Sequence, residues 1–103
     1  MVETGNARLL SAIGLARKAG KLTIGTDMVC DAVRSHKITL VIASGYASEN
    51  TKKRISDCAS FYKTDVNFVQ ISTEELGAAI GKSACACIGV SDENFRILIE
   101  RNL

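Results

Sequence analysis

The sequence of 103 residues contains no proline, no tryptophan and a single histidine, His36. Without proline, glycine and polar capping residues must mark the ends of the helices and strands. A single histidine also leaves a serine or cysteine nucleophile almost without candidates for a general base, and no partner residue is spaced to orient His36. We interpret His36 as a residue near the C-terminal end of a helix. The phosphate-binding patterns G-x-G-x-x-G and G-x-x-x-x-G-K-[ST] are absent as well. We therefore expect that the protein is not an enzyme.

Long apolar runs are also missing. The longest, from Ile38 to Ala43, is interrupted by Thr39, whereas a membrane-spanning helix needs about 20 apolar residues. The first residues show no basic region followed by an apolar one, so we predict no signal peptide and no membrane association. These features together predict a cytoplasmic protein.

Four cysteines are present, and in a cytoplasmic protein they are expected to be reduced thiols. Cys85-x-Cys87 is spaced more tightly than the usual zinc-binding pairs, which leave two to four residues between ligands. Cys30 and Cys58 stand alone in the sequence. We predict no metal site, no cofactor and no native disulfide.

Composition and charge are those of one small globular domain that spans residues 1–103. Hydrophobic residues make up 47% of the chain and charged residues 23%, which suits a chain with a single modest core.

The formal net charge is +2 and the isoelectric point is near 8.4, below the value of about 9 typical of strongly basic nucleic-acid-binding domains. A role in RNA binding must therefore depend on where the cations lie. They form four groups: Arg17, Lys18 and Lys21; Arg34 and Lys37; Lys52, Lys53 and Arg54; and Lys82. Each group taken alone is also explained by the helix dipole and by solubility.

Helical and extended patterns alternate along the chain. Apolar spacing predicts helices over about 6–19 and 26–36, the second capped by Thr26. Ser48 is expected to cap a third helix that packs inward through Ile55, Cys58, Ala59 and Tyr62. Ser72 and Glu75 form a capping box for a fourth helix, and a fifth follows Asp92. Strands are predicted at 21–24, 38–43, 67–71 and 84–90. This order favours an α/β fold with helices on both faces of one sheet.

The strand predicted at 84–90 has one face made of very small residues. Cys85, Cys87 and Gly89 alternate along it. Small side chains allow a covering helix to approach closely, and this is our interpretation of the Cys-x-Cys pair.

Two segments resemble a known family of ribosomal proteins. They are Leu15-Ala16-Arg17-Lys18-Ala19-Gly20-Lys21-Leu22-Thr23-Ile24-Gly25-Thr26-Asp27 and Glu75-Leu76-Gly77-Ala78-Ala79-Ile80-Gly81-Lys82. Both are similar to segments of the ribosomal L7Ae/L30e family, in particular its short bacterial branch, whose members bind kink-turn RNA. The resemblance covers about residues 6–90. It implies a three-layer α/β/α sandwich around a four-stranded mixed sheet. It also implies a ribosome-associated protein that binds structured RNA and has no catalytic activity.

In the family that this chain resembles, two elements contact RNA. One is the start of the second helix, which corresponds here to Gly25, Thr26, Asp27, Met28 and Asp31. The other is the loop after the Leu-Gly-x-Ala-x-Gly segment, which corresponds to Lys82, Ser83 and Ala84. A helix N-terminus offers unpaired N–H groups to phosphate. We add Lys21 as a further phosphate contact, and a continuous positive surface that joins it to Lys82 and the second helix would favour RNA.

The sequence departs from the family pattern at this site. Asp27 stands where the family has an amide or a lysine, Met28 where it has Glu or Gln, and Asp31 where it has lysine. An ionised aspartate accepts hydrogen bonds but cannot donate them. Asp31 is equally explained as a solvated surface carboxylate. The alternative function is a protein-interaction or regulatory module that keeps this fold without binding RNA, because fold does not determine function.

Overall fold

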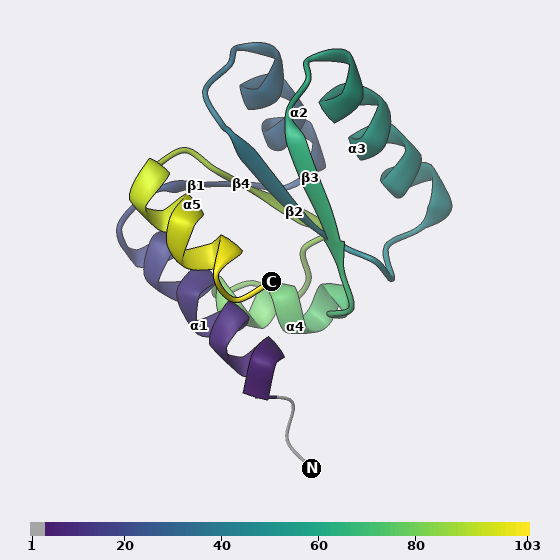
Figure 1. Cartoon of the computed structure of the whole chain (residues 1–103). Coiled ribbons are helices and arrows are strands. Elements are labelled where there is room, and N and C mark those ends of the chain that lie inside the picture. Colours follow the sequence, from purple (N-terminus) through teal and green to yellow (C-terminus); the bar gives the residue numbers. More distant parts are fainter. Residues whose placement is uncertain (1–3) are drawn as a thin grey trace.

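A computed structural model of the chain describes residues 4–103 and shows three layers, with helices on both faces of one sheet (Figure 1). The predicted α/β/α sandwich with a four-stranded mixed sheet is therefore confirmed. Along the chain the elements are α1 (Thr4–Lys18), β1 (Leu22–Ile24), α2 (Thr26–Arg34), β2 (Leu40–Ser44), α3 (Glu49–Phe61), β3 (Asp65–Val69), α4 (Thr73–Ala79), β4 (Cys87–Val90) and α5 (Glu93–Glu100). None of the helices in this described part is long and apolar enough to cross a membrane.

The sheet has the strand order β1-β4-β2-β3. β4 is antiparallel to both β1 and β2, whereas β2 and β3 are parallel. Every residue of β2 is buried, because both faces of this central strand are covered. Leu40 and Ile42 face the core shared with α1, α4 and α5, while Val41 and Ala43 face the core shared with α2 and α3. The period-2 alternation of a strand thus divides the apolar residues between two cores.

The bounds of α2 differ from the prediction at both ends. Thr26 is the first helical residue and not the cap; Gly25 occupies the cap position without a side-chain hydrogen bond. The helix ends at Arg34, because His36 has a positive φ of 58°. The other predicted caps are confirmed, with Ser48 accepting from the Thr51 N–H, and Ser72 and Glu75 forming a capping box.

All four strands differ in their bounds from the sequence prediction; β1 differs least, since it starts at Leu22 and not at residue 21. β2 starts at Leu40 and not at residue 38. β3 covers 65–69 and not 67–71, because the chain leaves the sheet after Val69 and Ile71 turns into the core of α1, α4 and α5. β4 begins only at Cys87, because the Cys85 N–H is bound by the Thr73 carbonyl at the start of α4, 2.9 Å away.

The interpretation of Cys85, Cys87 and Gly89 as one small face of a strand is wrong. Cys85 precedes the strand and packs in the core of α1, α4 and α5, whereas Cys87 packs in the core of α2 and α3. The space above Gly89 is filled by the Ile38 side chain and not by a helix. The alternation of strand faces predicted the wrong side for Cys85, because Cys85 lies before the first residue of the strand, where that alternation does not apply.

Candidate nucleic-acid interface

One end of the sheet gathers most of the residues predicted to contact RNA. β1 ends there, β4 begins there and β2 ends there, since Ile24 pairs with Ile88 and Ala43 pairs with Cys87. We call this end the Gly25 edge, and it comprises the start of α2 (25–28), the loop before β4 (81–86) and the turn after β2 (44–46). Three segments far apart in the sequence therefore meet at one place.

Gly25 connects β1 to α2 in a conformation that favours glycine. Its φ of 94° and ψ of 151° lie in a region that residues with a Cβ rarely occupy. Its N–H donates to the Cys87 carbonyl over 3.1 Å, which extends the pairing of β1 with β4 by one bond, and its carbonyl accepts from the Val29 N–H over 2.9 Å. Gly25 thus joins the sheet and the helix directly, so the sheet fixes where α2 begins.

The loop that carries Lys82, Ser83 and Ala84 is held against α4. A Cβ on Gly77 would lie 2.6 Å from the Cα of Ala84, so glycine is required for this close approach. The Gly77 carbonyl also accepts from the Lys82 N–H at 2.8 Å. Lys82, Ser83 and Ala84 are all exposed. Their backbone is held in place by its contacts with Gly77 of α4.

Cys85 links this loop to the start of α2. Its thiol donates to the Cys87 carbonyl over 3.0 Å. Burial raises the pKa of the Cys85 thiol, while hydrogen bonds with the backbone of Cys87 and Gly25 oppose that increase. The structure therefore brings together the two segments that the family resemblance implicated, with a buried thiol between them.

The acidic residues at the start of α2 are both paired with arginines. Asp27 forms an ion pair of 2.5 Å with Arg54 of α3, and Asp31 forms one of 2.9 Å with Arg34 one turn further along α2. The hydrogen bond with Asp27 is the main cause of an increase in the pKa of Arg54. Met28 is 61% exposed, and Met28 and Asp31 line one shallow hollow, as their helical spacing predicts. The two arginines offset the negative charge that the sequence places here.

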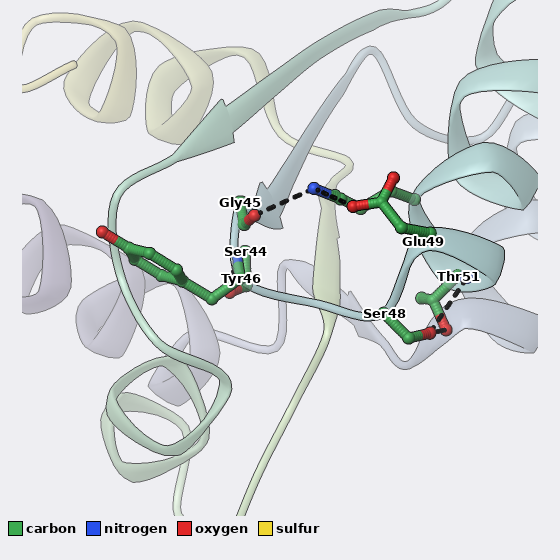
Figure 2. A network of polar contacts seen from close by, with 7 residues as sticks. Ser44, Gly45, Tyr46, Ser48, Glu49 and Thr51 are labelled. Atoms are coloured by element: carbon green, nitrogen blue, oxygen red, sulfur yellow. Dashed lines mark hydrogen bonds and ion pairs between the residues drawn. The ribbon is translucent and has the colours of Figure 1, made fainter.

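Sequence reasoning missed the turn after β2. The buried Ser44 hydroxyl donates to the Ile71 carbonyl over 2.6 Å and accepts from the Tyr46 N–H over 3.1 Å. Lys52 of α3 donates to the Gly45 carbonyl over 3.2 Å and pairs with Glu49 at 3.1 Å (Figure 2). The Tyr46 ring extends from this turn on the side away from Ser48, and Tyr46 is 67% exposed (Figure 2). The Ser-Gly-Tyr segment gave only a turn signal in the sequence, and its position at the Gly25 edge follows from the strand order.

Lys21 is not part of this edge. It precedes β1, whose other end reaches Gly25, so about 13 Å of strand separates the two. Its ammonium lies 4.0 Å from the Asp92 carboxylate, which follows the far end of β4. Lys21 therefore lies at the opposite end of β1 from Gly25 and the start of α2.

The four cysteines are unpaired thiols. The Cys58 thiol donates to the Cys30 carbonyl over 3.7 Å, and burial, followed by a hydrogen bond with Cys58, raises the pKa of Cys30 to about 11. Within residues 4–103 no three histidine, cysteine, aspartate or glutamate side chains are placed to share a metal ion. His36 is exposed and contacts Tyr62 edge to face.

Known proteins share this fold and sequence. Residues 7–99 match the Ribosomal protein L7Ae/L30e/S12e/Gadd45 family. The RNA-binding protein YlxQ of Bacillus subtilis is 36% identical over 83 residues, which cover 81% of this chain and 82% of that protein. A solved structure of a protein with unknown function from Bacillus halodurans C is 39% identical, with a TM-score of 0.84, and covers 93% of this chain and 97% of that one. The Giardia lamblia 15.5kD RNA binding protein shares the fold, with a TM-score of 0.77 at 14% identity over 99% of this chain and 87% of that one. The chain therefore belongs to the L7Ae/L30e/S12e/Gadd45 family of ribosomal and RNA-binding proteins.

Proposed function

We propose that this protein binds a sharply bent, kink-turn-like RNA at the Gly25 edge and that this RNA belongs to the translation machinery. The observation that carries the proposal is that the α2 N-terminus and the 82–84 loop meet at one end of the sheet, where Gly25 donates a 3.1 Å hydrogen bond to Cys87, the first residue of the strand that follows the loop. Two elements that the resemblance assigns to RNA contact thus form one surface. Membership of a family with RNA-binding and ribosomal proteins supports the same function.

The chemistry of the edge suits the irregular part of a folded RNA. The first turn of α2 presents backbone N–H groups to a phosphate, and Lys82 adds a cation on the neighbouring loop. The exposed Tyr46 ring offers a stacking surface for a base that has left its helix. A regular A-form duplex hides its base edges in a deep, narrow groove. A bent or bulged RNA exposes them, so we propose that class of ligand.

A direct test compares three RNAs in one binding titration. They are an intact kink-turn, the same RNA with its G·A pairs replaced by Watson–Crick pairs, and a straight duplex of equal length. We expect the intact kink-turn to bind at least tenfold more tightly than either control. Equal affinity for all three RNAs would contradict shape recognition and leave only general attraction to phosphate.

Lysine variants then test where the RNA lies. Lys82→Ala should flatten the dependence of log affinity on log salt by roughly 0.7–0.9, the contribution of one phosphate contact. Lys21→Ala is the matched control, since it also removes one exposed lysine, but at the far end of β1. We expect a smaller effect from Lys21→Ala than from Lys82→Ala. If the two variants change the slope equally, the RNA does not sit at the Gly25 edge.

A protein-interaction role is the second candidate, because exposed Met28 lies between Asp27 and Asp31 on the outer side of α2. The acidic character of this surface is reduced because Asp27 pairs with Arg54 and Asp31 pairs with Arg34. The triple variant Asp27→Asn, Met28→Glu, Asp31→Lys restores the family pattern on an exposed surface. It should gain both affinity and discrimination between the intact and the altered kink-turn. A variant that gains neither would favour the protein-interaction role.

Translation is tested separately from RNA binding. Crosslinking in cells followed by sequencing of the bound RNA identifies the ligand directly. We expect ribosomal or other translation-related RNA to be enriched. Enrichment of unrelated RNAs would retain the binding function and reject the assignment to translation.

A further inference from the structure

A group of aromatic and basic residues lies at the end of the sheet opposite the Gly25 edge. The C-terminal ends of α2 and α3 lie side by side there, at the top of the view in Figure 1. His36 and Tyr62 contact edge to face with ring centroids 6.0 Å apart, and Phe61 and Tyr62 do so at 4.8 Å. We call this group the Phe61 surface; its members are Arg34, His36, Lys37, Phe61, Tyr62 and Lys63.

The exposure of Phe61 has no explanation in the fold. Tyr62 is half-buried and packs against the core of α2 and α3, together with the buried Ile55 and Ala59. Phe61 lies outside this apolar face, and 78% of it is exposed. The ring is nevertheless supported from the side by Tyr62. An exposed, supported aromatic ring offers a face on which an unpaired base can stack.

Three basic residues belong to the Phe61 surface. Lys37 and Lys63 follow the ends of the two helices and are exposed, and within the described part of the chain neither takes part in an ion pair. Arg34 is hydrogen-bonded to Asp31, and the proximity of Tyr62 raises the pKa of the Arg34 guanidinium. Each helix C-terminus carries roughly half a negative charge. The two positive charges of Lys37 and Lys63 exceed the combined negative charge of the two helix ends. Phosphate is therefore attracted to the surroundings of the exposed ring.

The backbone is unusual at the same place. His36 and Lys63 are the positive-φ residues other than glycine in the described chain, at 58° and 57°. Non-glycine residues in this region are uncommon and often mark functional positions. Here they end α2 and α3 at the same level, so the rings and the lysines are presented together.

We propose that the Phe61 surface binds single-stranded RNA, with an unpaired base stacked on Phe61 and the flanking phosphates beside Lys37 and Lys63. A protein partner would require further exposed apolar surface beside Phe61, whereas the exposed residues next to it in the chain, Ser60 and Lys63, are polar. β2 is five residues long and separates this surface from the Gly25 edge by roughly 17 Å. A single-stranded extension of a bound RNA can span that distance, and the Phe61 surface does not depend on a kink-turn.

The absence of tryptophan from the sequence makes a direct test possible. Phe61→Trp introduces a single fluorescent reporter that keeps a stacking ring at the site. Titration with a six-nucleotide single-stranded RNA should quench this fluorescence by a fifth or more. Phe68→Trp is the matched control, because Phe68 is an exposed aromatic residue on β3, outside the Phe61 surface. Circular dichroism then checks that both variants are folded.

Charge and ring variants complete the experiment. Lys37→Gln and Lys63→Gln in the Phe61→Trp background should each weaken hexanucleotide binding two- to fivefold, and more strongly at low salt. Phe61→Leu should weaken the binding of a kink-turn with a single-stranded extension at least threefold, but leave a blunt-ended minimal kink-turn unaffected. This contrast separates the proposal from the function assigned to the Gly25 edge.

Three results would overturn the proposal. They are quenching of equal size in Phe68→Trp, quenching that is unchanged by both lysine variants, and no quenching of Phe61→Trp by RNA. A fluorescence change that depends on protein concentration alone would instead identify the Phe61 surface as a contact between copies of this chain.

Discussion

The Asp27 carboxylate of α2 and the Arg54 guanidinium of α3 form an ion pair of 2.5 Å at the Gly25 edge. An ionised Asp27 side chain accepts hydrogen bonds but cannot donate them to an RNA. Arg54 reaches this position from the neighbouring helix. A positive charge from α3 thus lies beside the start of α2, although it is partly neutralised by Asp27.

Asp27→Asn is expected to strengthen RNA binding three- to tenfold. It removes a negative charge beside the RNA and leaves Arg54 available to a phosphate. The slope of log affinity against log salt should therefore steepen by roughly 0.7–0.9, the contribution of one phosphate contact. The measurement is the dissociation constant of a kink-turn RNA over a range of salt concentrations. Asp57→Asn is the control, since it releases Lys53 from an exposed pair on the same helix. Equal gains in the two variants would show that only net charge matters.

Asp31→Lys is expected to strengthen the same binding about tenfold. The substitution changes the local charge by two units and breaks the pair with Arg34. Salt and solvent strongly reduce such effects at an exposed site, so the gain should be largest at low salt. Asp57→Lys makes the same change of charge on α3. A gain that persists undiminished at high salt would argue against an electrostatic cause.

Gly77→Ala is expected to destabilise the protein by about 1–3 kcal/mol, the usual cost of overpacking, and to weaken RNA binding. A methyl group at this position would collide with the backbone of Ala84 and displace the loop that carries Lys82. Ala78→Gly provides the control, because it weakens the same helix by about 1 kcal/mol without a collision. Denaturant unfolding and RNA titration of both variants separate loss of stability from displacement of the loop. If the two variants bind RNA equally well, the position of the loop does not matter.

The buried thiols predict a loss of stability at alkaline pH. Burial raises the pKa of Cys87 from its ordinary value of 9.0 to about 12. Between these values the unfolded chain loses the Cys87 proton while the folded chain keeps it, so rising pH favours unfolding. The contribution reaches at most about 1.4 kcal/mol per pH unit. Cys87→Ala should unfold with a shallower pH dependence between pH 9 and 12 than the natural chain. Identical slopes would mean that this thiol does not contribute.

The sequence predicted the number and order of elements because their signals are local. The capping box of Ser72 and Glu75 and the cap at Ser48 depend on residues within one helical turn, and both are confirmed. Strand ends were less predictable, because they depend on pairing between distant segments. The late start of β4 follows from the hydrogen bond between Cys85 and Thr73, which no local pattern reveals.

The candidate site was only partly predictable for the same reason. The resemblance indicated the start of α2 and the 82–84 loop, and strand register brings them together. It could not indicate Arg54, which reaches Asp27 through the packing of α3 on α2. Lys21 lies near Gly25 in the sequence, but the extended conformation of β1 places it at the far end of the sheet.

The hydrogen bond from Gly25 to Cys87 also affects how the protein and a bound RNA adapt to one another. Since this bond belongs to the sheet, α2 cannot shift its first turn without breaking strand pairing, and the close contact with Gly77 of α4 fixes the 82–84 loop. The protein surface is preorganised, so the entropic cost of ordering on association falls on the RNA. An RNA that is flexible when free would be folded by the protein, and magnesium or mutations that bend it in advance would raise its apparent affinity without a new contact.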